Sequence, residues 1–188
     1  KVSIFVLSVS SKYALNIKKI ANEMPADEIL SKVREYNCNF VCFTGGEPLQ
    51  QSGTVELLKK FCNEGFMVSL ETNGHYSLEN IDKRVIKVVD FKCPASKMTK
   101  LNNYKNLEYL NSNDEIKFVI ENKKDYNWAK EIIVKYGIPD KDYNIIFSPV
   151  FKKMDAKKLS KWILRDNLKV RMQLQIHKYI WNPKKRGV

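Results

Sequence analysis

Short apolar runs alternate with amphipathic helical patterns along the chain, and this alternation constrains the fold more than any other feature. The runs are rich in β-branched and aromatic residues and mostly apolar throughout, as strands buried on both faces of a parallel sheet are. Strands are expected at residues 4–9, 40–43, 67–70, 85–91, 116–120, 145–147 and 170–174. Repeated strand–helix units with right-handed crossovers predict an α/β fold, a partial (incomplete) TIM-like β/α barrel of about six parallel strands.

Four amphipathic helices are expected between these strands. Pro25 stands where a first helical turn begins, and the carboxylates of Asp27 and Glu28 follow near the positive end of the helix dipole. The apolar faces recur at helical spacing and comprise Ile29, Leu30, Val33 and Tyr36; Leu57, Leu58, Phe61 and Cys62; Trp128, Ile132, Ile133 and Tyr136; and Leu159, Trp162 and Ile163. Since no repeat or linker interrupts the pattern, residues 1–188 are predicted to form a single domain.

Composition excludes several classes of protein. The chain has 188 residues, of which 44% are hydrophobic, so it is long and apolar enough to build a core. No apolar run approaches the length of a membrane span, and the start reads as a strand rather than a secretory signal, so a cytoplasmic location is expected. The four cysteines, Cys38, Cys42, Cys62 and Cys93, are too sparse for a disulfide framework, and no metal or cluster site can be assembled from them.

The net charge of +12 comes from 33 basic residues against 21 acidic ones. A basic chain can bind nucleic acid. Here, however, the bases are mostly lysines scattered along helical patterns, which is typical of solvated faces. An anionic small molecule near a cleft explains the same surplus, so nucleic acid is not expected to be the principal ligand.

Polar segments follow five of the expected strands. They are Thr44-Gly45-Gly46-Glu47-Pro48, Glu71-Thr72-Asn73-Gly74, Lys92-Cys93-Pro94-Ala95-Ser96, Ser148-Pro149-Val150 and Gln175-Ile176-His177-Lys178. Because the carboxyl ends of parallel strands share one rim, these segments are expected to converge on a polar small molecule, one with an amine. Adjacent glycines let the backbone approach such a ligand closely. The alternative is ordinary loop chemistry, in which Glu47 caps a turn, Asp90 and Lys92 form a surface ion pair, and His177 is structural.

These motifs, in this order, resemble the 7-carboxy-7-deazaguanine synthase family of the radical S-adenosylmethionine (SAM) superfamily. The first motif alone indicates the superfamily. The proline-serine loop and the tail QLQIHKYIW at residues 173–181 indicate the narrower family. The resemblance runs from about Lys12 to the end of the sequence.

The resemblance implies roles for individual residues but no catalytic side chain. SAM would be bound by Gly46, Glu47, Glu71, Asn73, Pro94, Ala95, Ser96, Ser148, Pro149 and Val150. The substrate, 6-carboxy-5,6,7,8-tetrahydropterin, would contact Thr44, His177 and the carboxylate of Val188, which suits a guanidine-like edge. Mg²⁺ would be held at Ser11.

The resemblance also implies a reaction and partners. A [4Fe-4S] cluster would reduce SAM to give a 5′-deoxyadenosyl radical, and the pterin would become 7-carboxy-7-deazaguanine with loss of ammonia, in queuosine biosynthesis. The implied partners are an electron donor such as flavodoxin and a second copy of the chain in a homodimer. Neither nucleic acid nor a membrane is expected as a partner.

One departure from the family is large. The family holds its cluster with cysteines spaced C-x-x-x-C-x-x-C near the first strand and binds substrate with a nearby Gly-Glu-Gly loop, and neither is present here. Residues 4–6 resemble the strand before that loop and residues 10–15 the segment after it. We therefore expect that the cluster loop and the substrate loop are missing from this chain between about residues 2 and 12. The alternatives are a cluster-free relative, another radical enzyme such as a glycyl-radical activase, and a basic α/β module that binds nucleotides or RNA.

Overall fold

A computed structural model describes residues 5–9, 24–138 and 143–182 of the chain. The described residues form two compact units. The first comprises residues up to Thr72 together with 76–87, and the second comprises residues 73–75 and those from Val88 onward. The expectation that residues 1–188 form one radical-SAM-type domain stays a prediction.

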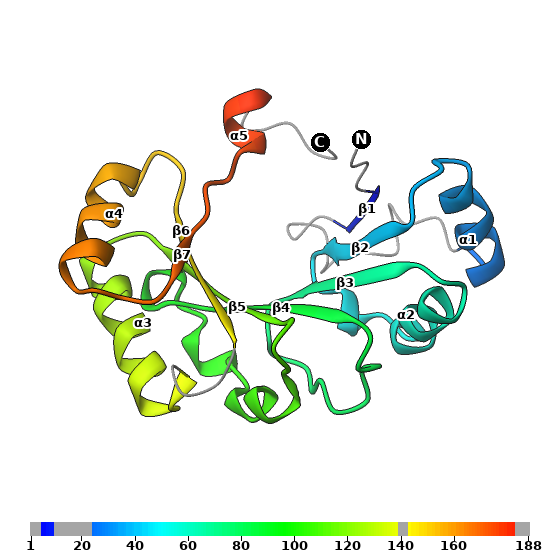
Figure 1. Cartoon of the computed structure of the whole chain (residues 1–188), viewed down its shortest axis with the longest axis horizontal. Helices are drawn as coiled ribbons and strands as arrows, with labels where there is room; N and C mark the ends of the chain where they lie inside the picture. The colour runs from blue at the N-terminus through cyan, green and yellow to red at the C-terminus, as the bar shows by residue number, and fades with distance from the viewer. Residues whose placement is uncertain (1–4, 10–23, 139–142, 183–188) are drawn as a thin grey trace. The chain divides into compact units, whose positions relative to one another are not determined.

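The first unit is a parallel three-stranded arrangement with two helices (Figure 1). Its strands are β1 (Phe5–Val9), β2 (Phe40–Gly45) and β3 (Met67–Thr72), which pair in chain order. Its helices are α1 (Ala26–Arg34) and α2 (Thr54–Asn63), and a 3-10 turn, η2, spans Pro48–Gln50. Phe43 of β2 packs edge-on against Phe61 of α2 with ring centroids 5.4 Å apart, so α2 covers one face of the strands.

The second unit repeats the same plan with four strands. Its strands are β4 (Ile86–Phe91), β5 (Glu115–Ile120), β6 (Asn144–Pro149) and the short β7 (Arg171–Met172), again parallel and in chain order. The part of β4 that belongs to this unit begins at Val88. Helices α3 (Lys123–Lys135) and α4 (Ala156–Arg165) lie on one side of these strands (Figure 1). The remaining elements are α5 (His177–Ile180) and the 3-10 turns η3 (Pro94–Ser96), η4 (Thr99–Leu101) and η5 (Tyr104–Tyr109).

Aromatic packing holds the helices on the strands of the second unit. Trp128 of α3 meets Phe118 of β5 at 6.1 Å between ring centroids, and Tyr126 of α3 meets Phe147 of β6 at 5.9 Å. Phe118 and Phe147 are themselves 5.8 Å apart and edge-on. The helix-covered face of these strands is therefore the core of the unit, consistent with the burial of apolar area as the main stabilising term.

Strands β4 and β5 are not buried on both faces, contrary to the expectation from sequence, whereas β6 is buried on both from Ile145 to Pro149. In β4 and β5, residues facing the helices are fully buried, whereas the intervening residues are partly exposed. The partly exposed set includes Asp90, Glu115 and Lys117. This face of β4 and β5 is therefore partly exposed and carries charged side chains.

The predicted helices are confirmed, with one wrong assignment to a buried face. Helix α1 ends at Arg34, so Tyr36 lies beyond it and is 57% exposed. Three strands end later than predicted: β2 extends to Gly45, β3 to Thr72 and β6 to Pro149, so Thr44, Glu71 and Ser148 lie within strands. No helix in the described ranges is long and apolar enough to cross a membrane.

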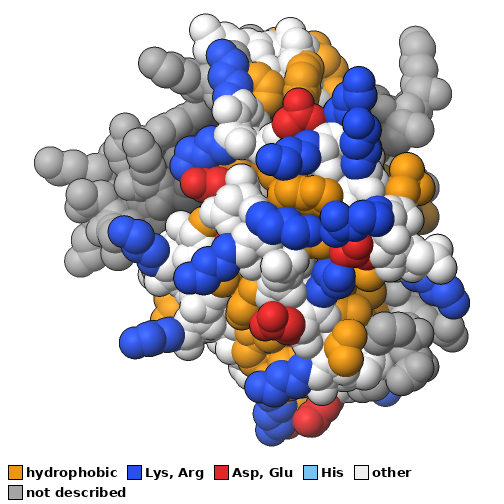
Figure 2. Space-filling view, turned by 90° about the vertical axis from the view of Figure 1, so that its left-hand side faces the viewer, with side chains coloured by type: hydrophobic (Ala, Val, Ile, Leu, Met, Phe, Trp, Pro, Cys, Tyr) orange, Lys and Arg blue, Asp and Glu red, His pale blue; other side chains and the backbone are white. Residues whose placement is uncertain are grey.

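Basic side chains are dispersed over the face shown in Figure 2. Lysines and arginines there alternate with acidic, apolar and neutral polar groups, as expected for solvated helical faces. This distribution agrees with the interpretation of the +12 charge as a general surplus of lysine.

Candidate functional site

The turn after β2 is held by Glu47, a residue that the family resemblance predicted to contact SAM. Gly45 has φ 135°, a conformation that favours glycine, and this brings the chain into η2. Glu47 is 7% exposed, and its Oε1 accepts hydrogen bonds from the Leu49 backbone N–H at 3.1 Å and from the Thr72 hydroxyl at 2.8 Å. Glu47 therefore caps η2 and ties it to the end of β3, which is the structural role that the sequence left open.

The neighbouring strand end carries an exposed pair of side chains. The hydroxyl of Thr44, at the end of β2, donates to Glu71 Oε2 of β3 at 3.3 Å. The pair lies on the face opposite Phe43, because side chains alternate along a strand. In the first unit, four of the predicted binding residues thus lie at the carboxyl ends of the adjacent strands β2 and β3. They are Thr44, Gly46, Glu47 and Glu71.

In the second unit, Asn73 and Gly74 make a tight turn. The Asn73 side chain accepts from the His75 backbone N–H at 2.9 Å. Gly74 is buried with φ 71°, and a Cβ at that position would lie 2.8 Å from Val89 Cγ1. Its carbonyl accepts from the Asn106 side chain at 3.0 Å, so the turn is fixed to the η5 segment. A rigid turn of this kind presents Asn73 in a constant position.

At the end of β4, Asp90 and Lys92 form an ion pair of 2.7 Å between Lys92 Nζ and Asp90 Oδ2. The second carboxylate oxygen, Asp90 Oδ1, is buried and has no hydrogen-bond partner among the residues that the structure describes. An unpaired buried acceptor is uncommon because its desolvation is not offset. It is typical of a place where a ligand completes the hydrogen bonding.

The loop at Pro94–Ser96 is positioned by a residue that sequence reasoning missed, Asp125. This fully buried carboxylate accepts from the Ala95 backbone N–H at 2.9 Å through Oδ1 and from the Glu121 backbone N–H at 3.0 Å through Oδ2. It thereby joins the loops that follow β4 and β5. The signal was present in the sequence: Asn122 is the N-cap of α3 and Asp125 stands three residues later, the spacing of a capping box.

The end of β6 is well packed. Ser148 is 1% exposed, Pro149 is buried, and the Val150 N–H donates to the carbonyl of Ile120 at 2.9 Å. Since β4, β5 and β6 are parallel neighbours, Pro94–Ser96 and Val150 lie at strand ends on the same edge of this unit. His177 is exposed at the first turn of α5.

Some of the residues predicted to bind SAM, substrate or Mg²⁺ cannot be located relative to one another from these observations. Ser11 and Val188 lie outside the described residues. Gly46 belongs to the first unit, and Asn73, Ser148 and His177 belong to the second, so a cavity shared by all four stays a prediction.

The cysteines do not provide the ligands of an iron–sulfur cluster. All four are free thiols, and Cys42, Cys62 and Cys93 are buried. Burial, followed by the nearby carboxylates of Asp125 and Asp90, raises the pKa of Cys93, which disfavours the thiolate that a metal needs. Among the described residues, no group of three or more His, Cys, Asp or Glu side chains could hold a metal ion.

The backbone is similar to that of a solved structure. The crystal structure of Streptococcus suis SuiB bound to precursor peptide SuiA matches with a TM-score of 0.63 at 16% identity, over 92% of this chain and 48% of that one. The chain thus spans about half the length of that structure, and the likeness concerns the fold alone. The family model of the radical SAM superfamily matches residues 9–90. The likeness shows the expected α/β fold of the incomplete TIM-like type, and the family model indicates the radical SAM superfamily as the class for residues 9–90.

Two relatives identify the family within that class. The 7-carboxy-7-deazaguanine synthase of Chlorobaculum tepidum is 45% identical over 168 residues, covering 88% of this chain and 76% of the relative. The enzyme of the same name from Koribacter versatilis is 38% identical over 184 residues, covering 90% and 81%. The chain belongs to the 7-carboxy-7-deazaguanine synthase family, as its motifs indicated.

The residues present fit SAM better than they fit the cluster. Within the second unit, the fixed loop at Pro94–Ser96 has backbone groups, and Asp90 Oδ1 is an acceptor, of the kind that a polar ligand with an ammonium group would use. The radical SAM family implies a [4Fe-4S] cluster as well, but the four cysteines described above do not supply its ligands.

Proposed function

We propose that the full-length protein is a radical SAM lyase that converts 6-carboxy-5,6,7,8-tetrahydropterin into 7-carboxy-7-deazaguanine and ammonia, in queuosine biosynthesis. The observation that carries this proposal is the 45% identity to a 7-carboxy-7-deazaguanine synthase over 88% of the chain. In the proposal, SAM is the precursor of the radical. The chain binds and orients SAM and the pterin and excludes water.

The described residues support roles in binding rather than in proton transfer. Thr44 and Glu71 offer an exposed hydroxyl and carboxylate at neighbouring strand ends, where Thr44 would face the substrate and Glu71 the cofactor's ribose or adenine. The backbone at Gly46 and at Pro94–Ser96 would line the cofactor, because small side chains and 3-10 turns leave peptide groups accessible there. Glu47, Asp125 and Gly74 would hold these segments in place.

We also propose that the natural protein carries a cluster-binding loop and a substrate loop between about residues 2 and 12. The support is the family membership together with the absence of a C-x-x-x-C-x-x-C motif from this sequence. β1 ends at Val9 and pairs with β2 up to Gly45, so any such loop would leave the sheet beside the glycine turn. Sequencing the encoding gene tests this: an uninterrupted reading frame for Val6-Leu7-Ser8-Val9-Ser10, with no three-cysteine motif, overturns the proposal.

Finer features of the proposal come from the family alone. They are Mg²⁺ at Ser11, substrate contacts by His177 and the carboxylate of Val188, a flavodoxin-like electron donor, a homodimer and a cytoplasmic location. Nucleic acid is not proposed as a ligand. Each of these is separable from the reaction itself, so their failure would leave the activity standing.

The activity is tested by anaerobic assay of the full-length protein after iron and sulfide reconstitution, with SAM and the carboxytetrahydropterin. We expect 7-carboxy-7-deazaguanine and ammonia in equal amounts. Cleavage of SAM without either product would contradict the substrate and would favour another radical SAM reaction, such as activation of a glycyl-radical enzyme. Strong, salt-sensitive RNA binding without SAM binding would instead favour a nucleic-acid-binding module.

A further inference from the structure

Three asparagines of the second unit, Asn102, Asn103 and Asn106, contact two strand-end turns at the same time. The backbone N–H of Asn103 donates to the carbonyl of Gly74 at 3.1 Å, and the Asn106 side chain donates to the same oxygen at 3.0 Å. The Asn102 side chain binds Lys92, the first residue after β4. The three residues thus form an asparagine cluster that joins the turn after β3 to the loop after β4.

Asn102 binds the backbone of Lys92 in the way that a neighbouring strand would. Its Oδ1 accepts from the Lys92 N–H at 2.8 Å, and its Nδ2 donates to the Lys92 carbonyl at 3.0 Å. A carboxamide has the same kinds of donor and acceptor as a peptide group, so it can continue the hydrogen bonding of a strand. Since Nδ2 also donates to the Tyr104 hydroxyl at 3.3 Å, both polar atoms of Asn102 bond within the protein. Asn102 therefore fixes the point at which the loop leaves β4.

Asn106 fixes the other turn from inside the core. Its side chain is fully buried, and a buried amide is costly unless it is hydrogen-bonded. The carbonyl oxygen of Gly74 has two lone pairs and accepts from both Asn106 and the Asn103 N–H. The turn that carries Asn73 is thus held by two bonds to the asparagine cluster.

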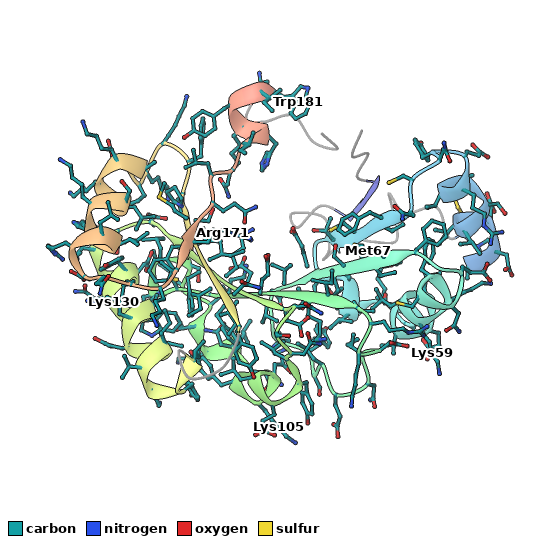
Figure 3. All side chains as sticks on the ribbon, viewed as in Figure 1. Lys59, Met67, Lys105, Lys130, Arg171 and Trp181 are labelled. Atoms are coloured by element: carbon teal, nitrogen blue, oxygen red, sulfur yellow. The ribbon has the colours of Figure 1, made fainter. Side chains whose placement is uncertain are left out.

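Ring packing and a capping bond fix the asparagine cluster itself. Tyr104 stacks on Tyr136 with ring centroids 4.5 Å apart and ring planes at 18°, and its centroid lies 5.2 Å from that of Phe91. The Asn103 side chain caps η5 by accepting from the Lys105 N–H at 3.2 Å, and the exposed Lys105 is labelled in Figure 3. Because these contacts involve neither of the two turns, the cluster is a fixed reference for both.

The loop at Pro94–Ser96 is therefore held at two points. Asn102 binds its start at Lys92, and Asp125 binds its middle. A ligand that touches both this loop and the turn at Asn73 meets groups whose spacing is set before it binds. Such preorganisation increases affinity because less conformational freedom is lost on binding.

We propose that Asn102 is a positioning residue for SAM, which acts through Lys92 to hold the loop at Pro94–Ser96 at a fixed spacing from the turn at Asn73. The inference rests on the proposed function, which assigns both segments to the cofactor. Asn102 acts through the loop alone and takes no part in the chemistry.

Two variants of the full-length, reconstituted protein test this role. Asn102→Ala removes both bonds to Lys92, and Asn102→Asp keeps the side-chain volume but places an oxygen against the Lys92 carbonyl. Without ligand, both should speed amide hydrogen exchange in the peptide that contains Pro94–Ser96 by roughly 10-fold. Equilibrium dialysis should show a SAM dissociation constant raised by roughly 10-fold, and the anaerobic assay a raised KM for SAM with kcat unchanged.

Asn111→Ala is the matched control. Asn111 is also partly exposed, and its side chain accepts from the Asn113 N–H at 2.9 Å. It precedes β5, however, so it lies at the edge opposite to the strand ends. This variant should leave both the exchange at Pro94–Ser96 and the SAM dissociation constant unchanged.

The outcomes separate this role from the proposed function. Wild-type affinity for SAM in both Asn102 variants, with or without faster exchange, would overturn the positioning role and leave the proposed function intact. An equal loss of affinity in Asn111→Ala would indicate general destabilisation and would also overturn it. A wild-type protein that did not bind SAM would overturn both.

Discussion

Gly74 is a position where the backbone tolerates a side chain poorly. Its φ of 71° is unfavourable for other residues, and a Cβ there would lie 2.8 Å from Val89 Cγ1. Gly74→Ala is expected to lower the free energy of unfolding by about 2–4 kcal/mol, from left-handed strain and overpacking together. Urea unfolding followed by circular dichroism measures the difference.

Gly65 provides a matched control for Gly74. It has a similar φ of 83° but no atom within 4 Å of a built Cβ, so Gly65→Ala should show only the conformational strain, about 1–2 kcal/mol. If the two variants lost equal stability, close packing at Gly74 would not be the cause.

At the scale of elements, Asp125 connects α3 to the loops after β4 and β5. Asp125→Ala would leave the backbone N–H groups of Ala95 and Glu121 without their acceptor. We expect a loss of about 1–3 kcal/mol for each buried donor left unsatisfied. Because Pro94–Ser96 would also lose its anchor, SAM binding should weaken in titrations at temperatures where the variant is folded. Unchanged stability and unchanged SAM affinity together would contradict the anchoring role.

The contact between α3 and α4 should make stability depend on acid pH. Hydrogen bonds from Arg165, Lys130 and Tyr126 hold the pKa of Asp166 well below its usual range. A carboxyl with a depressed folded-state pKa stabilises the protein above its unfolded pKa of about 4, and that contribution is lost as pH falls further. The free energy of unfolding should therefore decrease from about pH 4 toward pH 2, and less steeply for Asp166→Asn.

Asp82 offers an independent check of this pH dependence. Its hydrogen bonds with Arg84 lower the pKa of Asp82 to about 2, so it loses its contribution over the same acid range. Asp82→Asn and Asp166→Asn should flatten the acid limb additively, since the two carboxyls lie in different units. A wild-type unfolding free energy that stayed constant between pH 4 and pH 2 would contradict both assignments.

The sequence predicted the order and type of the elements because their patterns are local. Apolar spacing placed α1 to α4, and strand propensity placed β1 to β6. It failed for Tyr36, which shares the apolar spacing of α1 but lies beyond the helix end at Arg34, where Asn37 takes a φ of 48°. The partly exposed face of β4 and β5 was missed because the sequence does not show which of two similar lysines is buried. Lys87 of β4 is buried, whereas Lys117 of β5 is partly exposed.

The strand-end site was predicted in outline for the same reason. Parallel topology alone puts residues that follow strands at one edge, so Thr44 and Glu71 could be paired in advance. The uses of Glu47 and Asp125 depend on which backbone groups fall within hydrogen-bond distance, and sequence does not give those distances. The pairing of Asp90 with Lys117 depends on strand register, which is also set by the whole sheet.

For the whole molecule, the account depends on the strand ends of both units enclosing one cofactor. The most direct measurement is a crystal structure of the full-length protein grown with SAM. The account predicts that Gly46, Asn73, Ser148 and His177 surround one cavity, with SAM against the glycine turn. SAM bound elsewhere, with these four residues on different sides of the molecule, would contradict it.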